Sequence, residues 1–274
     1  MPYDKLLFLL KYVILYQIIM EKYMNKMRIE GQNYYFTSTK PFKSFATLKE
    51  STISQVFDFA YKMTFGNEGQ HRNHRSGGSH QRRLGEIFAD TFQGKLSEFA
   101  IYNTLYTDFK MEIPDLGVWE LGKWDDVDLI ADDMRLNVKS TKAFGHLLLL
   151  ETKDWDSDGN YLPNVDKNEG QYDAFILVRM SPFCADILKK IKAYYSDIVN
   201  YEELKHEICS QKWAYDIPGF IWNDELKQVI SSNMVIHRGD LLNGKTKMDA
   251  ENFYVQAGDL HPIEELKRGK NGKS

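Results

Sequence analysis

The sequence predicts an α/β protein in which a central mixed β-sheet is flanked by α-helices. In the first half of the chain, apolar residues recur at the three- and four-residue spacing of amphipathic helices. From Trp124 onward the pattern changes to short apolar runs bounded by turn residues, which is typical of strands. The 274 residues are 43% hydrophobic and 27% charged, a globular composition that allows a sizeable core. No repeat or long linker divides the chain, so we expect one main domain over residues 34–266.

The N-terminal stretch Leu6–Met20 is strongly apolar but does not predict a membrane span. It has about 15 residues where a span needs about 20, and a lysine and a glutamine interrupt it. It also lacks the small-residue cleavage site of a signal peptide. We expect a helical extension over residues 1–33. The alternative is that the natural chain starts at Met24 or Met27 and that this stretch is not native.

Two helices are predicted before the sheet begins. Ser51–Met63 has apolar residues at helical spacing after an N-cap signal at Ser51 or Thr52. Arg83–Phe109 repeats that spacing, and Gly94 within it predicts a break between two helices or a cap.

The sheet is predicted to start with a hairpin. Trp124–Ala131 and Arg135–Thr141 have the pattern of two strands joined by a tight turn at Asp132–Asp133. A flexible tail is expected over residues 267–274. The other predicted elements are strands at Leu147–Glu151, Phe175–Met180, Met234–Leu242 and Phe253–Val255, and helices at Ala185–Tyr195, Tyr201–Cys209 and Asp224–Ser231.

Charge and cysteine content limit the classes of function. A net charge of −4 argues against a protein that coats nucleic acid along its whole surface, although it is compatible with a local basic patch. Cys184 and Cys209 are the only cysteines and lack metal-finger spacing, as expected of a reduced, cytoplasmic protein. The HExxH, GxSxG and GxGxxG motifs are absent.

The predicted hairpin carries the residues with the clearest chemical potential. Because side chains alternate along a strand, Asn137 and Lys139 share one face, whereas Leu136 and Val138 point into a core. The short turn lets Asp128 converge with Asn137 and Lys139. Carboxylate and amide oxygens hold a hard cation such as Mg²⁺, and a lysine can neutralise charge that develops on a phosphate. This combination suits hydrolysis of a phosphodiester.

The hairpin resembles the PD-(D/E)xK nuclease superfamily, which includes many Type II restriction endonucleases. The matching residues are Asp128 and then Asn137-Val138-Lys139. The resemblance implies a restriction-endonuclease-like fold, with metal ligands at Asp128, Asn137 and the Val138 carbonyl, and a catalytic lysine at Lys139. Asn137 departs from the family pattern because an acid is usual there. The resemblance also suggests that Glu98, on the preceding helix, completes the metal site.

Two alternatives remain open for these assignments. Glu98 could instead be an exposed helix glutamate paired with Lys95 or Tyr102. Glu151-Thr152-Lys153 is a second ExK sequence after an apolar run, and with Asp128 or Asp133 as its partner it would restore the usual acid. We favour Asn137 and Lys139 because a single hairpin joins them to Asp128.

A basic segment at His71–Arg83 provides a second candidate site. It contains four of the nine arginines and three of the seven histidines, and no acidic residue. Arginine side chains suit phosphates and guanine edges. We therefore expect DNA contacts from Arg72, Arg75, His80, Arg82 and Arg83. The alternatives are a disordered basic loop that serves solubility and a metal site made of His71, His74 and His80.

Together these features predict a Mg²⁺-dependent endonuclease that cleaves double-stranded DNA as a sequence-specific Type II restriction enzyme. A homodimer is expected, since two-fold DNA sites are read by two-fold proteins. No membrane role is expected. The alternatives are a structure-specific or repair DNA nuclease of the same fold, and a catalytically inactive DNA-binding module.

Overall fold

The computed structural model describes residues 24–66, 82–117, 127–163 and 170–271. The apolar N-terminal stretch and most of the basic segment lie outside these ranges. Within the ranges, no helix has the length and apolar character needed to cross a lipid bilayer.

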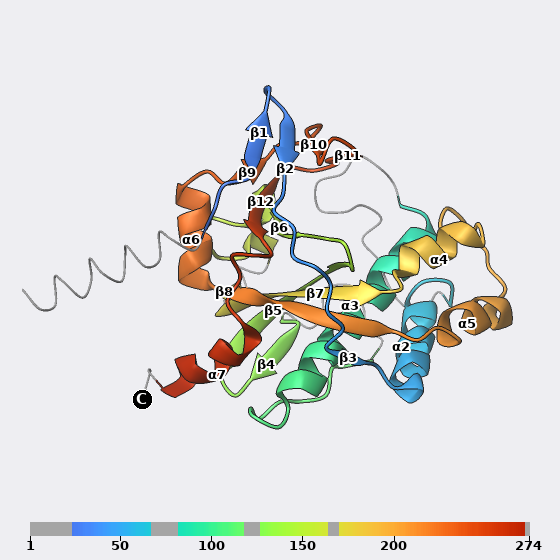
Figure 1. Ribbon diagram of the computed structural model, residues 1–274. Coiled ribbons are helices and arrows are strands. Elements are labelled where there is room, and N and C mark those ends of the chain that lie inside the picture. Colours follow the sequence, from blue (N-terminus) through green and yellow to red (C-terminus); the bar gives the residue numbers. More distant parts are fainter. Residues whose placement is uncertain (1–23, 67–81, 118–126, 164–169, 272–274) are drawn as a thin grey trace, which may run out of the picture.

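A five-stranded sheet forms the centre of the structure (Figure 1). Strands β5 and β7 run parallel, whereas the other neighbouring strands are antiparallel. The predicted α/β class with a mixed sheet is therefore confirmed. The strands, in the spatial order β3-β8-β7-β5-β4, are β3 Ala46–Thr47, β8 Ala214–Trp222, β7 Ala174–Ser181, β5 Met134–Lys142 and β4 Leu129–Ala131.

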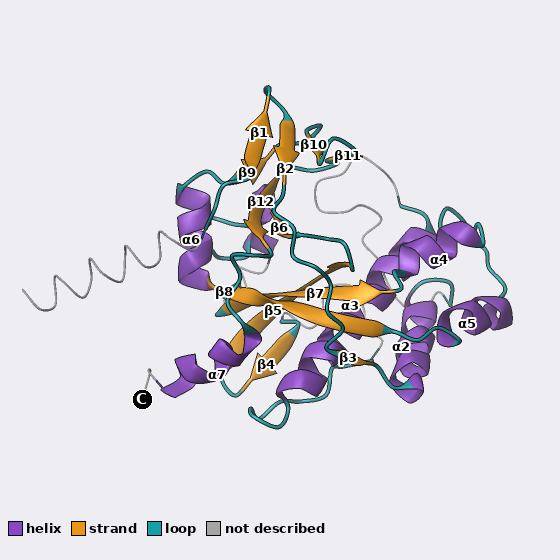
Figure 2. Ribbon diagram, in the orientation of Figure 1, coloured by secondary structure: helices purple, strands orange, loops and turns teal. Residues whose placement is uncertain are grey.

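Helices cover one face of this sheet, and Figure 2 shows them grouped on that side. Ile176 and Val178 of β7 are buried in the core that these helices share with the sheet. Phe92 and Trp213 meet edge to face in the same core, with ring centroids 5.1 Å apart. The helices are α2 Glu50–Met63, α3 Leu84–Leu105, α4 Cys184–Lys190 and α5 Tyr201–Cys209.

Smaller sheets cover the opposite face. Because side chains alternate along β7, Phe175 and Leu177 point away from the helices and join a second core with Tyr254. One small sheet has the order β6-β12-β9, and the other has the order β1-β2-β10-β11. Their elements are β6 Leu147–Glu151, β12 Asn252–Gln256, β9 Val235–Ile236, β1 Arg28–Glu30, β2 Tyr34–Phe36, β10 Leu241–Leu242 and β11 Thr246–Lys247, with α6 Asn223–Ser231 beside them.

Helix α3 runs through Gly94 without a break, so the predicted interruption is wrong. A glycine inside a helix costs about 1 kcal/mol relative to alanine. That cost is offset because α3 buries Phe88, Phe92 and Leu96 completely in the core. A Cβ atom added at Gly94 would meet no atom within 4 Å, and Gly94 lines an open cavity.

Two other helix boundaries differ from the sequence predictions. Helix α2 begins at Glu50 with Lys49 in the N-cap position, and no side chain caps it, so the cap signal at Ser51 was wrong. Helix α4 ends at Lys190 rather than Tyr195, because Lys192 takes a left-handed backbone with φ of 60°.

The folded region also extends beyond both predicted limits. Arg28–Glu30 forms strand β1, where a helical extension was expected. The expected flexible tail begins inside helix α7, Ile263–Asn271. Within α7, Lys267 forms an ion pair with Asp108 at 2.6 Å, which ties the C-terminal helix to the segment after α3.

Candidate active site

The predicted hairpin is present. Strands β4 and β5 pair antiparallel, with Leu129 opposite Leu136 and Ala131 opposite Met134. Asp132 begins the turn with φ of 53°, a left-handed conformation that aspartate tolerates better than most residues. Its side chain accepts a hydrogen bond from the Lys110 backbone N–H at 2.9 Å, which stabilises this turn.

Asp128 is fixed to the neighbouring strand of the hairpin. Its Oδ2 accepts a hydrogen bond from the Val138 backbone N–H at 2.7 Å. Leu136 and Val138 pack in the core shared with the helices, so the alternation of β5 directs Asn137 and Lys139 to the other face. The sequence prediction of these two faces is confirmed.

Asn137 is a buried amide with one unused oxygen. The residue is 4% exposed, and its Oδ1 has no hydrogen-bond partner in the part of the chain that the structure describes. Its side chain hydrogen-bonds Tyr172. Burial raises the pKa of the Tyr172 hydroxyl, and the charge of Asp128 raises it further, while the hydrogen bond from Asn137 lowers it. The electrostatic influence of Asp128 and the hydrogen bond of Asn137 therefore meet at Tyr172.

Lys139 is partly exposed and lies opposite Leu177 of β7. Its ammonium makes no hydrogen bond or ion pair with another residue of the described ranges. A lysine without a fixed counter-ion keeps its charge available for an anionic group.

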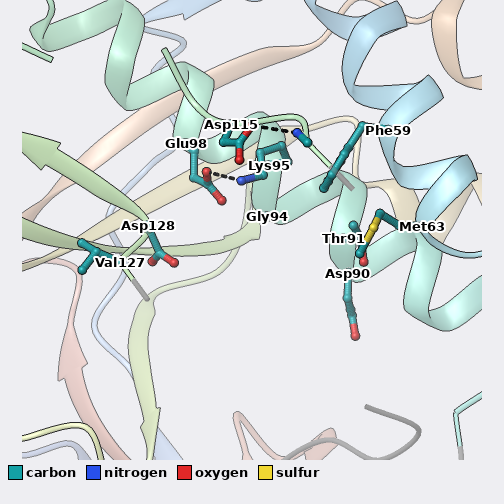
Figure 3. A pocket seen from close by; sticks show the side chains of 11 residues that line it. Phe59, Met63, Asp90, Thr91, Gly94, Lys95, Glu98, Asp115, Val127 and Asp128 are labelled. Carbon is teal, nitrogen blue, oxygen red and sulfur yellow. Dashed lines mark hydrogen bonds and ion pairs between the residues drawn. The ribbon is translucent and has the colours of Figure 1, made fainter. Parts of the chain in front are cut away.

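A cavity of about 230 Å³ brings α3 and the start of the hairpin together (Figure 3). Glu98 and Asp128 both line it, as do Gly94 and Lys95. Lys95 Nζ forms an ion pair with Glu98 Oε2 at 2.7 Å, and the two side chains are only 14% and 12% exposed. The ion-pair alternative for Glu98 is thus observed, but the glutamate is a largely covered part of a cavity wall rather than an exposed residue on a helix surface.

The oxygen donors near the hairpin suit a hard divalent cation. Asp128 supplies a carboxylate, and the buried Asn137 Oδ1 lacks the partner that such an atom normally has. Glu98 supplies a second carboxylate to the cavity that Asp128 lines. Across the described ranges, no three His, Cys, Asp or Glu residues gather closely enough to hold a metal ion. A site here would therefore depend on the amide or on backbone oxygen.

The second ExK sequence lies in another sheet. Glu151 ends β6, where it is opposite Asn252 of β12, and Lys153 belongs to a short 3-10 helix, Thr152–Asp154. Lys153 Nζ is 4.0 Å from Glu151 Oε2. Asp128 precedes a strand of the central sheet, so no common hairpin joins these residues to it.

Only the end of the basic segment lies within the described residues. Arg82 forms an ion pair with Asp90 at 3.0 Å, and Arg83 forms one with Asp197 at 2.6 Å. Arg83 is also the N-cap residue of α3. Asp90 lines the cavity, so Arg82 connects the basic segment to the cavity wall. The other predicted DNA contacts, Arg72, Arg75 and His80, lie outside the described residues, as do His71 and His74.

Some cavity residues were not predicted from the sequence. Lys95 could have been found as a cavity residue, because it lies one turn before Glu98 on the same face of a helix. Asp115 gave no signal, since it lies in a loop that the fold brings to the cavity.

Comparison of the chain with protein-family models, with curated proteins and with solved structures finds no match.

Proposed function

We propose that this chain is a Mg²⁺-dependent endonuclease with a restriction-endonuclease-like fold, which hydrolyses double-stranded DNA as a site-specific Type II enzyme. The observation that carries the proposal is the 2.7 Å hydrogen bond between Asp128 and the Val138 backbone. It ties the carboxylate to the strand that bears an unused amide oxygen and an available ammonium group. The parallel pairing of β5 with β7, the next strand of the central sheet along the chain, also supports the proposed fold.

The oxygen donors have distinct tasks in this proposal. Asp128 and Asn137 would hold Mg²⁺ together with the Val138 carbonyl, and Glu98 would act from the cavity wall. When bound, Mg²⁺ lowers the pKa of an attacking water and polarises the phosphate. Asp128 keeps a fixed orientation because one of its oxygens is held by the backbone.

Lys139 would act on the phosphate itself. Water loses a proton to solvent as its oxygen bonds to phosphorus, the bond to one ester oxygen breaks, and the departing alkoxide takes a proton from solvent. Negative charge builds up on the phosphoryl oxygens during this step, and the Lys139 ammonium stabilises it. DNA would be oriented by the basic segment, and a homodimer would meet a two-fold site with two such centres.

Digestion of a supercoiled plasmid with Mg²⁺ tests the proposal. We expect discrete fragments, and we expect Asp128→Ala and Lys139→Ala to lower the cleavage rate by about 100-fold or more while retaining DNA binding in Ca²⁺. Lys153→Ala is the matched control and should cleave normally. If Lys139→Ala cleaves normally and Lys153→Ala does not, the second ExK sequence carries the chemistry. A smear instead of fragments would indicate a nuclease that reads shape rather than sequence.

A catalytically inactive DNA-binding module is the second candidate. It is favoured by the uncharged Asn137 where an acid is usual, and by the ion pair that engages Glu98. The absence of nicking with both Mg²⁺ and Mn²⁺, together with retained DNA binding, would establish this alternative.

A further inference from the structure

The cavity beside the hairpin is lined by several acidic side chains and, among the described residues, by one basic side chain. Four carboxylates line the cavity, from Asp90, Glu98, Asp115 and Asp128, and Lys95 is the only cationic residue among its described lining residues. Asp90 is paired with Arg82, and Asp115 accepts a hydrogen bond from the Gly117 backbone N–H. Lys95 is therefore the cation among these lining residues that pairs with Glu98.

The position of Lys95 is well defined. Its ammonium is 2.7 Å from Glu98 Oε2 and 5.7 Å from the centroid of the Phe59 ring, within reach of a cation–π interaction. Figure 3 shows Lys95 and Glu98 turned towards each other. Because both side chains are poorly exposed, water screens their charges little, and the attraction between them is stronger than in a surface ion pair.

We propose that Lys95 competes with the divalent cation for Glu98. The ammonium neutralises the glutamate while the cation is absent, and it must leave the glutamate oxygen before that oxygen can become a ligand. This inference rests on the proposed function, because it takes Glu98 as a metal ligand. Lys95 itself lines the cavity, so open space adjoins its side chain.

The competition makes a prediction that is independent of DNA cleavage. Mn²⁺ binding to the full chain, measured from the loss of the free-ion electron paramagnetic resonance signal, should have a Kd about tenfold lower in Lys95→Met than in the natural sequence. Without metal, Lys95→Met should unfold at a lower temperature, since it removes the ion pair between Lys95 and Glu98. Added Mn²⁺ should raise that temperature more than it does in the natural sequence. Lys95→Gln also removes the charge but keeps a polar side chain, and it should show the same trends.

Two controls separate competition from a general loss of charge. Lys227→Met removes another lysine of an i, i+3 ion pair, with Asp224 on α6, and should leave Mn²⁺ binding unchanged. In a Glu98→Gln background, Lys95→Met should no longer tighten binding, because the competed oxygen is gone.

The outcomes are distinguishable. If both Lys95 variants bind Mn²⁺ no more tightly than the natural sequence, or if the gain persists in Glu98→Gln, Lys95 does not compete for Glu98. If neither the natural sequence nor the Lys95 variants bind Mn²⁺ at all, the proposed metal centre itself fails, and the inference falls with it.

Discussion

Among single residues, Asn137 shows how a proposed metal ligand can be buried in the fold. An amide can be buried at 4% exposure with one hydrogen bond to Tyr172, whereas a carboxylate there would need a counter-ion. In the proposed metal site, Asn137 would therefore let the protein fold without metal, but it would bring no negative charge to the metal. The nearby Asp128 carboxylate would add to the cost of a second negative charge at this position.

The substitution Asn137→Asp should make the protein less stable without metal and should strengthen metal binding. Without metal, the new buried carboxylate should lower the free energy of unfolding by about 1–3 kcal/mol, since burial removes the charge from water. With Mg²⁺ the protein should regain stability, and the Mg²⁺ concentration needed for half-maximal cleavage should fall about tenfold. Thermal unfolding with and without Mg²⁺ and cleavage over a Mg²⁺ series measure both effects.

The contrasting substitution is Asn137→Leu, which removes the oxygen without adding charge. It should lose cleavage and show no stabilisation by Mg²⁺. If Asn137→Asp is destabilised equally with and without Mg²⁺, this side chain does not contact the metal.

At the element scale, helix α3 combines a structural face with the cavity wall. Its buried residues join the core, and Gly94, Lys95 and Glu98 line the cavity. Gly94→Ala should raise the free energy of unfolding by about 0.5–1 kcal/mol, because alanine favours helix and its Cβ meets no atom within 4 Å. The added methyl group occupies the open side of the cavity, so cleavage should slow. Urea denaturation and the plasmid assay test the two effects.

Asn103→Ala provides the control on the same helix. Asn103 is exposed within α3 and does not line the cavity, so the substitution should stabilise without changing cleavage. If Gly94→Ala is more stable and fully active, the cavity is not needed for the reaction.

The elements also show how far the sequence could predict the structure. Strict alternation predicted the two faces of β5, and the apolar spacing predicted α3. The uninterrupted course of α3 through Gly94 was not predictable, because burial against the core outweighs the local cost of glycine. The sequence left open whether Glu98 pairs with Lys95, because the i, i+3 spacing of the two residues does not show whether they are buried together. The pairing of β6 with β12 joins residues about 100 positions apart, and local patterns carry no information on such contacts.

At the scale of the whole molecule, long-range polar contacts join the layers. Arg179 of β7 is 1% exposed and donates hydrogen bonds to Asp216 Oδ1 at 2.8 Å and to the carbonyl of Lys40 at 2.6 Å. Lys40 belongs to the segment that connects β2 to β3 along the central sheet (Figure 1). These hydrogen bonds tie the connection between β2 and β3 to β7 and β8 of the central sheet, and β7 pairs directly with the strand that carries Asn137.

His261 lies just before the C-terminal helix α7 and forms ion pairs with Glu225 of α6 and Glu265 of α7. These ion pairs should make the stability of the protein depend on pH. His261 Nε2 is 2.6 Å from Glu225 Oε1, and Nδ1 is 3.3 Å from Glu265 Oε2. The hydrogen bond to Glu225 raises the pKa of His261 above its ordinary value of 6.5, although burial acts in the opposite direction. Because the folded protein holds this proton more tightly than the unfolded chain, the contribution is complete below about pH 6.5 and is lost as pH rises through the raised pKa.

Urea denaturation of the natural sequence and of His261→Gln at about pH 6 and about pH 9 measures this contribution. The difference in the free energy of unfolding between the two proteins should be larger at the lower pH, because only then does the natural protein gain from the charged ion pair. His206→Gln, at an exposed position of α5, controls for the general effect of losing a histidine. A difference that stays constant or grows with pH would mean that His261 stabilises the fold as a neutral ring packed against Phe220, whose centroid is 5.5 Å away. Packing of the ring on Phe220, rather than the charge of His261, would then stabilise this part of the fold.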